Sequence, residues 1–344
     1  MTVTRCTRCI LPETFPNITF DDRGVCSYCR EVGDVQQLAV ERQALQSQLD
    51  ALFHEAKANP KSGAIYDVIV AYSGGKDSTY TLKLLRERYQ LNCLAVTIDN
   101  GFLSESTFEN CRTIADRLSV DHIFFKPAFD FMRRLYQLSV TRELHVKSAI
   151  KRASAICNSC INLVNVHMIN VALQNGVSIV AGGYLGGQLP RGKAHIELNR
   201  NLMARMRESD LAKYERHLGA VARNYFALHA NNADDSDNVI CVVNPLVAFD
   251  YDEAQIVREI TALGWKPPKD TGLNSTNCML NDVGIAIHQR RHGFHPYEPE
   301  LAQLVREGRM ERSDALRKVE TIPSGEVLQP ILQRLSLKEE QFEG

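Results

Sequence analysis

The chain carries almost no net charge and contains no long apolar run. Its 344 residues include 40 Lys and Arg against 41 Asp and Glu, which gives a formal net charge of −1 at pH 7. Affinity for nucleic acid comes mostly from neutralised phosphates, so this balance favours a small-molecule substrate and leaves tRNA as an alternative. No run reaches the length of a membrane span, and we expect no membrane partner.

The first residues also lack the charged start and the apolar core of a secretory signal. We therefore expect a cytoplasmic protein. In a reducing compartment its ten cysteines are expected to be metal ligands, catalytic thiols or buried apolar side chains rather than a disulfide framework.

Four cysteines near the start have the spacing of a metal site. Cys6 and Cys9 form one C-x-x-C pair, Cys26 and Cys29 form another, and sixteen residues separate the pairs. This spacing is typical of a closed, tetrahedral zinc site with a structural role. Between the pairs lie the turn formers Pro12, Pro16, Asn17, Asp21, Asp22 and Gly24, with little independent helix or strand signal, so a metal is needed to hold the segment together. Four unrelated thiols or an iron site are the alternatives.

A glycine turn joins the apolar run at 68–71 to a helical pattern. A strand, a glycine turn and a helix N-terminus form a cradle for a phosphate group, because backbone N–H groups and the helix dipole point at the anion. The lysine adds a full charge, and the serines add hydroxyl donors. The turn consists of Ser73, Gly74, Gly75, Lys76, Asp77 and Ser78. An ordinary turn capped by Asp77 and Ser78 is the alternative.

Further apolar runs alternate with helical patterns. Strands are expected at 94–98, 121–125, 177–181 and 239–243, and helices at 34–58, 104–118, 129–150 and 161–174. This alternation predicts an α/β fold with a doubly wound, mostly parallel, five-stranded sheet. The predicted segments are a zinc-binding module (1–33), a helix with a linker (34–63), an α/β domain that contains the phosphate cradle (64–250) and a helical C-terminal region (251–344).

Two glycines follow the strand expected at 177–181. Gly182 and Gly183 would let a ribose or an α-phosphate approach the backbone closely. Packing of these glycines against another part of the chain explains them equally well.

Three further cysteines are candidates for chemistry. Cys157 and Cys160 share one face at the start of a helix, where a thiolate forms more easily. Cys278 lies in a polar, irregular stretch, which is unusual for a merely buried thiol. A role in sulfur chemistry is the favoured interpretation. A pair of core cysteines or a second zinc half-site are the alternatives.

The turn at 73–78 resembles the PP-loop of the ATP pyrophosphatases, the adenine nucleotide α-hydrolase-like superfamily with a HUP-like fold. The resemblance implies that the turn holds the pyrophosphate half of ATP, that Lys76 and Asp77 are catalytic, and that Mg²⁺ offsets the phosphate charge. It also implies that a substrate carbonyl oxygen attacks the α-phosphate, pyrophosphate leaves, and a nitrogen or sulfur nucleophile then displaces AMP. The backbone near Thr97 and Ile98 would contact adenine.

Two branches of that superfamily are similar to different parts of the chain. Cys157-x-x-Cys160 resembles the tRNA 2-thiolating enzymes, which implies that these thiols and Cys278 bind a 4Fe–4S cluster or handle persulfide. Those enzymes usually have Gly-His where Gly182 and Gly183 stand. The segment 6–78 is similar to the N-acetyl sugar amidotransferases, which use ammonia from a separate glutaminase to make an acetamidino group.

Ammonia needs no thiol carrier, whereas sulfur does. We therefore expect the adenylated oxygen to be replaced by sulfur, giving a thiocarbonyl, a thioamide or a thiolated base, with a sulfur donor protein as partner. The sugar amidotransferase with its glutaminase is the alternative, and a homodimer is an open expectation. A non-enzymatic module that binds ATP or uses zinc for an interaction is a third hypothesis.

Overall fold

The computed structural model describes most of the chain. The described residues are 3–31, 35–59, 63–184, 192–228, 239–321 and 323–338. The chain divides into two compact units, and each unit combines segments that lie far apart in the sequence. The first unit holds Met1–Glu41, Leu135–Ser159 and Asp270–Gly344, and the second holds Arg42–Arg134 and Cys160–Lys269. The division predicted after residues 33, 63 and 250 stays a prediction, and residues 60–62 of its linker lie outside the described residues.

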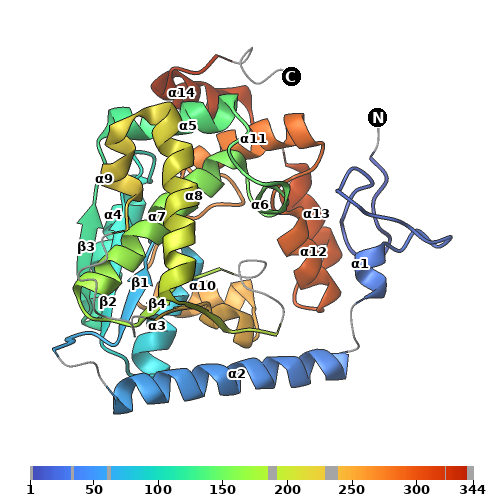
Figure 1. Ribbon diagram of the computed structural model, residues 1–344. Helices are drawn as coiled ribbons and strands as arrows, with labels where there is room; N and C mark the ends of the chain where they lie inside the picture. The colour runs from blue at the N-terminus through green and yellow to red at the C-terminus, as the bar shows by residue number, and fades with distance from the viewer. Residues whose placement is uncertain are drawn as a thin grey trace. The chain divides into compact units, whose positions relative to one another are not determined.

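The second unit is built on a six-stranded sheet (Figure 1). The strands are β1 (Val68–Ala71), β2 (Cys93–Ile98), β3 (Asp121–Phe125), β4 (Ile179–Ala181), β5 (His195–Leu198) and β6 (Ile240–Val243). Their order is β3-β2-β1-β4-β6-β5, and every neighbouring pair is parallel except β5 with β6. The predicted α/β class with a mostly parallel sheet is confirmed, with one strand more than the five predicted.

The strand that the sequence analysis missed is β5. It reads His-Ile-Glu-Leu, and only its last side chain is fully buried. A strand at the edge of a sheet pairs on one side and needs no continuous apolar run, so its sequence gives little signal.

The order of the strands reverses beside β1. From β1 the chain runs outward through β2 to β3, and it then crosses back to β4 on the other side of β1. In open α/β sheets ligands bind at such a switch point, outside the carboxyl ends of the strands. The turn at 73–78 follows β1 directly and therefore lies at the switch point.

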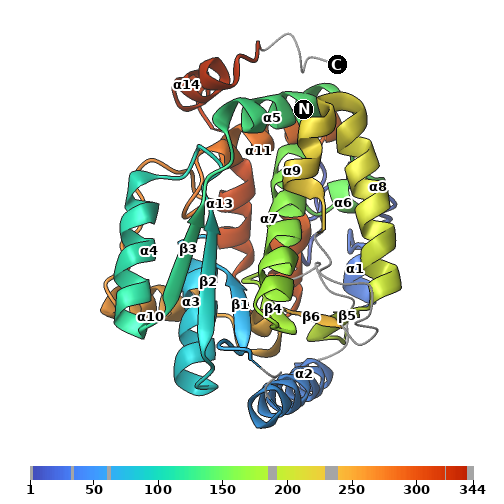
Figure 2. The ribbon, with the colours of Figure 1, turned by 60° about the vertical axis from the view of Figure 1, so that its left-hand side comes forward.

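Helices cover both faces of this sheet (Figure 2). One face carries α3 (Lys76–Lys83), α4 (Glu105–Leu118) and α10 (Glu253–Ala262), and the other carries α7 (Ala155–Gln174). The remaining helical segments of this unit are α8 (Arg200–Leu218), α9 (Arg223–Phe226), a π-helical turn at Leu84–Arg88, 3-10 turns at Ala220–Ala222 and Pro245–Ala248, and most of α2 (Val35–Ala58). At the start of α10, the Asp252 carboxylate accepts a hydrogen bond from the Gln255 N–H and caps the helix.

By length and composition alone, α7 could cross a membrane. Polar residues interrupt its apolar run, so the sequence alone did not indicate a membrane span here. A core helix of a soluble protein can have the same length and hydropathy. Within the second unit, Leu163 and Met168 of α7 are buried, and the Asn162 amide donates to the Tyr214 hydroxyl at 3.2 Å. These contacts are those of a core helix.

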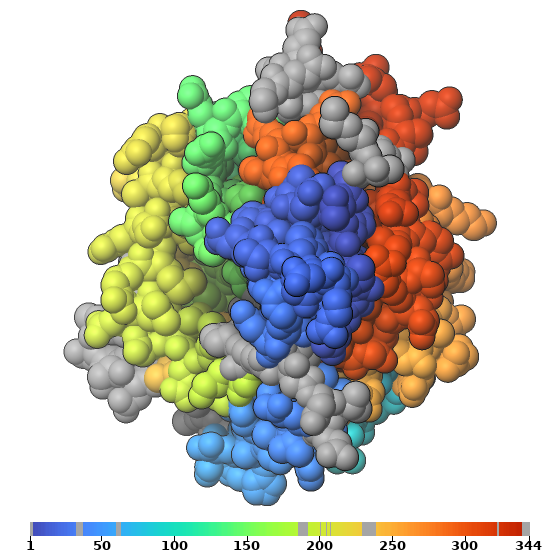
Figure 3. Space-filling model, turned by 90° about the vertical axis from the view of Figure 1, so that its right-hand side faces the viewer, coloured from blue at the N-terminus to red at the C-terminus, as the bar shows by residue number. Residues whose placement is uncertain are grey.

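The first unit joins the N-terminal module to the C-terminal helices. Its helices are α1 (Ser27–Arg30), the end of α5 (Phe129–Thr141), α6 (Lys147–Ile150), α11 (Leu280–His292), α12 (Glu298–Arg306), α13 (Arg312–Glu320) and α14 (Gly325–Leu335). In Figure 3 the N-terminal segment, in dark blue, lies against the red segment that holds α12 and α13. The Arg312 guanidinium donates to the carbonyl oxygens of Cys9 and Cys6 at 2.8 and 3.1 Å, and Arg5 donates to Glu298 at 2.8 Å.

The helix predicted at 129–150 is two helices with a break between them. The Leu144 N–H donates to the Arg142 carbonyl at 3.1 Å, which closes a tight turn, and the His145 ring lies 2.8 Å from the Ser159 hydroxyl. Neither glycine nor proline marks this break in the sequence. The next helix, α7, begins at Ala155 instead of 161, so Cys157 and Cys160 lie in its first turns.

Leu163→Ala is expected to lower the free energy of unfolding by about 2–5 kcal/mol, because a fully buried side chain leaves a cavity. The exposed Asn165 of the same helix is the control, and Asn165→Ala should change that free energy by no more than about 0.5 kcal/mol. Urea unfolding followed by circular dichroism measures both values, and equal values would contradict a core position for α7.

Candidate functional site

The turn between β1 and α3 has a backbone that glycine adopts far more readily than other residues. Gly74 has a φ of +72°, and a Cβ there would lie 2.7 Å from both Thr107 Cγ2 and Cys111 Sγ. The indole N–H of the buried Trp265 donates to the Gly74 carbonyl at 3.0 Å. α4 and Trp265 thus hold the turn in its left-handed conformation.

Two serine side chains close the turn on itself. Ser78 Oγ lies 3.0 Å from Ser73 Oγ, accepts from the Ser73 N–H at 3.2 Å and lies 3.1 Å from the Gly75 carbonyl, to which it can donate. Because the N-cap residue of α3 is Gly75, no side chain caps the first turn of that helix. The N–H groups of this turn can therefore bind an anion.

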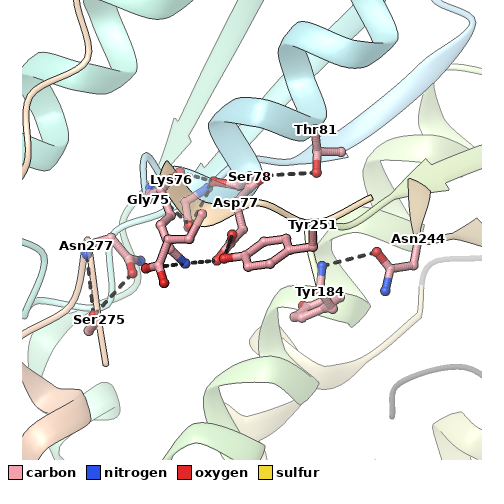
Figure 4. A network of polar contacts seen from close by, with 12 residues as sticks. Gly75, Lys76, Asp77, Ser78, Thr81, Tyr184, Asn244, Tyr251, Ser275 and Asn277 are labelled. Atoms are coloured by element: carbon pink, nitrogen blue, oxygen red, sulfur yellow. Dashed lines mark hydrogen bonds and ion pairs between the residues drawn. The ribbon is translucent and has the colours of Figure 1, made fainter. Parts of the chain in front are cut away.

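Lys76 and Asp77 are enclosed by groups from the start of α10 (Figure 4). The Lys76 ammonium lies 2.7 Å from Asp77 Oδ2 and 3.8 Å from Glu253 Oε1. The Tyr251 hydroxyl donates to Asp77 Oδ1 at 3.0 Å. Burial by itself lowers the pKa of Lys76, but the oxygens of Asp77, Tyr251 and Glu253 outweigh it and raise the pKa well above its usual value. Lys76 therefore keeps its charge.

The turn after β2 contacts a cysteine at the same edge of the sheet. Asp99 Oδ1 accepts from the Gly101 N–H, and Asn100 Oδ1 accepts from the Phe102 N–H, both at 2.9 Å. These bonds fix the turn, and the Asn100 amide Nδ2 donates to Cys160 Sγ across 3.9 Å.

Cys160 also influences the residue that follows the end of β4. Burial, together with a charge on Cys160, raises the pKa of Tyr184 to about 12. Cys160 thus contacts the turn after β2 and influences a residue that follows β4, and these two strands are the neighbours of β1.

The two predicted glycines after β4 are needed for packing. A Cβ at Gly183 would lie 2.8 Å from Ser78 Cα, so the missing side chain lets the end of β4 approach the turn. A Cβ at Gly182 would lie 2.6 Å from the ring of Tyr184. The packing alternative accounts for both residues, and their contact with a nucleotide stays a prediction.

Asn244, directly after β6, carries a buried donor without a partner. The residue is 2% exposed, and its Oδ1 accepts from the Tyr184 N–H at 3.2 Å (Figure 4). This bond fixes the orientation of the amide, because a backbone N–H can only donate. Within the described part of the chain, Asn244 Nδ2 has no hydrogen-bond partner. Such a donor is a natural partner for an oxygen of a ligand.

The residues expected near adenine are buried. Thr97 Oγ1 donates to the Tyr72 carbonyl and lies 2.7 Å from His122 Nε2, so the side chain is engaged inside the sheet. Ile98, at the end of β2, is also buried. A contact between their backbone and adenine stays a prediction.

The other two candidate thiols lie in the first unit. The Cys157 thiol donates to Asn281 Oδ1 across 3.7 Å, and the Cys278 N–H donates to Ser275 Oγ at 3.0 Å. Both cysteines are partly exposed. Because Cys160 belongs to the second unit, a cluster shared by all three stays a prediction.

The four cysteines of the N-terminal module form a compact group. Their Sγ atoms all lie within 4.8 Å of one another, and the pairs Cys6 with Cys29 and Cys9 with Cys26 are 3.7 Å apart. Thiolates at about 2.3 Å around a tetrahedral zinc ion lie about 3.8 Å from each other, so the spacing fits. Among the residues that the structure describes, this is the cluster of metal-ligating side chains that could hold an ion.

These four thiols do not all ionise without a cation. The hydrogen bond from Cys29 lowers the pKa of Cys9 to about 5, whereas burial raises the pKa of Cys26 to about 11. The pKa of Cys29 is raised because its thiol is bonded to Cys9. A divalent cation would bind all four cysteines as thiolates, and its charge would offset the repulsion among them.

Sequence reasoning missed four residues of the nucleotide site, namely Trp265, Tyr251, Glu253 and Asn244. The acidic start of α10 and the proline after Asn244 are visible in the sequence. No local pattern, however, tells that Trp265, Tyr251 and Glu253 contact the turn at 73–78, or that Asn244 contacts Tyr184, because the fold brings them together from distant parts of the chain.

Comparisons with known proteins agree with this geometry. Residues 67–216 match the family model of the arginosuccinate synthase N-terminal HUP domain. An uncharacterized protein of Methanocaldococcus jannaschii is 22% identical over 335 residues, which cover 97% of this chain and 99% of that protein. Argininosuccinate synthase of Pyrococcus furiosus is 24% identical over 145 residues, which cover 42% of this chain and 33% of that enzyme.

Among solved structures, the tRNA thiolase NcsA of Methanococcus maripaludis with its 4Fe–4S cluster is 12% identical, with a TM-score of 0.33. The alignment covers 93% of this chain and 90% of that protein. The family match and the geometry of the turn at 73–78 place residues 67–216 in the PP-loop ATP pyrophosphatase superfamily.

Gly74→Ala is expected to abolish ATP binding in a calorimetric titration. The substitution forces a Cβ against Thr107 and Cys111 in addition to the left-handed strain of about 1–2 kcal/mol. Gly176→Ala is the control, because Gly176 also has a positive φ (+66°) but no atom within 4 Å of its Cβ position. If Gly74→Ala bound ATP as well as Gly176→Ala does, the turn would not be the nucleotide site.

The N-terminal module is expected to hold one zinc ion per chain by elemental analysis. Cys9→Ser should lose the zinc and lower the melting temperature, because the module lies on α13 through bonds to the Cys6 and Cys9 carbonyls. Cys241→Ser, in β6, should keep the zinc. Full zinc content in Cys9→Ser would contradict the predicted site.

Proposed function

We propose that the chain is an ATP-dependent enzyme that adenylates a carbonyl or amide oxygen, releases pyrophosphate and replaces the oxygen with sulfur. The acceptor oxygen attacks the α-phosphate of ATP, and the bond to the pyrophosphate breaks. A sulfur nucleophile then adds to the activated carbon, and AMP leaves with the oxygen. The product is a thiocarbonyl, a thioamide or a thiolated base.

The turn at 73–78 is the part of the chain that would hold ATP in this reaction. The N–H groups at the start of α3, which no side chain caps, and the hydroxyls of Ser73 and Ser78 would bind the leaving pyrophosphate, and Lys76 would supply a full charge. Asp77 carries the carboxylate oxygens that Mg²⁺ prefers, and this ion, when bound, offsets the phosphate charge.

The position of Cys160 is the observation that carries the assignment to sulfur. Its thiol lies beside Asn100 after β2 and influences Tyr184 after β4, which puts it at the strand ends that flank the PP-loop. A thiol at the place where the α-phosphate is expected can deliver or hold sulfur next to the adenylated carbon. Cys157 and Cys278 are the further thiols that we assign to sulfur handling or to a 4Fe–4S cluster.

We place the acceptor substrate near the ends of β4 and β6, on the side of β1 opposite to β2. The resemblance puts adenine at β2 and pyrophosphate at β1, so the acceptor side lies toward β4 and β6. Asn244 after β6 offers a buried amide N–H without a partner in the described residues. This donor suits the carbonyl or amide oxygen of a small-molecule acceptor, with a thiolated tRNA base as the larger alternative.

A second candidate is an N-acetyl sugar amidotransferase that uses ammonia from a glutaminase. The observation that favours it is the N-terminal module with its four clustered cysteines, followed by a helix and the PP-loop. The same outline is expected of that branch. A sulfur donor protein would be the partner in the first case and a glutaminase in the second, both in the cytoplasm.

Anaerobic purification followed by iron and acid-labile sulfide analysis tests the sulfur assignment, together with pyrophosphate release from ATP. Sulfide with a tRNA or small amide acceptor, and ammonia with an acetamido sugar, are the two assay conditions. Cys160→Ser should lose sulfur-dependent turnover but keep ATP binding, whereas the control Cys241→Ser should keep both. Ammonia-dependent release of pyrophosphate in an active Cys160→Ser protein would favour the amidotransferase, and formation of ADP would contradict both.

A further inference from the structure

The ammonium of Lys76 is shared between two carboxylates that come from different helices. Asp77 is its neighbour in α3, at 2.7 Å, and Glu253 is the first residue of α10, at 3.8 Å. The Lys76 side chain is 13% exposed, so water screens these contacts only in part. The Tyr251 hydroxyl holds the other oxygen of Asp77 at 3.0 Å, as Figure 4 shows.

These carboxylates bind the Lys76 ammonium, which is the positive charge that would attract a phosphate at the turn. A polyphosphate bound at the start of α3 gains attraction from Lys76 only if the ammonium turns toward it. Asp77 is the next residue in the chain, so its side chain can move together with that of Lys76 and keep the contact. The contact with Glu253 comes from a separate helix, so a movement of the ammonium toward a bound phosphate has to lengthen it.

Joining α10 to α3 does not require Glu253. Another ion pair, between Lys83 Nζ and Glu259 Oε2 at 3.0 Å, already links these helices. An acidic residue in the first turn also favours helix formation, but any position of that turn provides this benefit. The placement of Glu253 beside Lys76 therefore needs its own explanation.

We propose that Glu253 is a positioning residue that competes with the phosphates of ATP for the ammonium of Lys76. ATP binding then costs the contact between Lys76 and Glu253, and the carboxylate sets how readily the loop accepts the nucleotide. This inference rests on the proposed function, because it assumes that the turn at 73–78 binds ATP.

The experiment is a calorimetric titration of the full-length protein with ATP in EDTA, so that no metal ion intervenes. Glu253→Gln keeps the shape of the side chain and removes its charge. It should lower the Kd for ATP about threefold, the scale of one partly exposed ion pair. The matched control Glu259→Gln, on the same helix and paired with Lys83, should leave this Kd unchanged.

A double-mutant cycle separates this role from a general charge effect. If Glu253 acts through Lys76, the gain from Glu253→Gln disappears in a Lys76→Met background. If Glu253 simply repels the anionic ligand, the gain persists in that background, and the proposal is wrong. A merely structural role would lower affinity and would not raise it.

The remaining outcomes are equally decisive. An unchanged or weaker affinity in a Glu253→Gln protein with the melting temperature of the wild type overturns the inference. Should Glu253→Gln fail to fold, Glu253→Asp is the second variant, because it shortens the side chain by one methylene. It should raise the affinity for ATP by a smaller factor. If Glu253→Asp does not raise the affinity, the inference is wrong. A wild-type protein that binds no ATP either in EDTA or with Mg²⁺ refutes the proposed function itself, whereas the outcomes above refute this inference alone.

Discussion

The candidate nucleotide site depends on the left-handed backbone at Gly74, where the chain leaves β1 and enters α3. This turn lies at the switch point of the sheet. It persists because Thr107 and Cys111 of α4 fill the space beside the glycine and because the Trp265 indole holds its carbonyl. Any side chain at this position would push α4 away. The shape of the turn and the packing of α4 on the sheet therefore both require a glycine here.

Charged side chains that are only partly exposed to water lie around this turn. Lys76, Asp77 and Glu253 form a small network whose members are partly shielded from water, and Tyr251 fixes its geometry. Opposite charges at this separation interact more strongly here than on an open surface. In the proposed function, a bound polyphosphate would have to rearrange this set of contacts.

The N-terminal module solves a different physical problem. Its segment between the cysteine pairs is rich in turns and buries only a small apolar group that includes Ile10, Leu11 and Phe15. Four thiols gather at the spacing of a tetrahedral ion, and Arg312 binds two of their carbonyl oxygens from α13. The expected metal and the guanidinium would add to the small hydrophobic core of the module, which includes Ile10, Leu11 and Phe15.

The sequence by itself determined the features that local chemistry dictates. The run of apolar residues before a glycine turn and a helix defined the phosphate cradle at 73–78, and two C-x-x-C pairs defined the group around Cys6, because neighbours along the chain create both. The tertiary structure alone decided which distant residues complete the site. Glu253, Trp265 and Asn244 reach it only because parallel strands align their carboxyl ends and α10 packs on α3. The edge strand β5 also appeared only in the fold, since a strand that pairs on one side leaves no clear periodicity in its sequence.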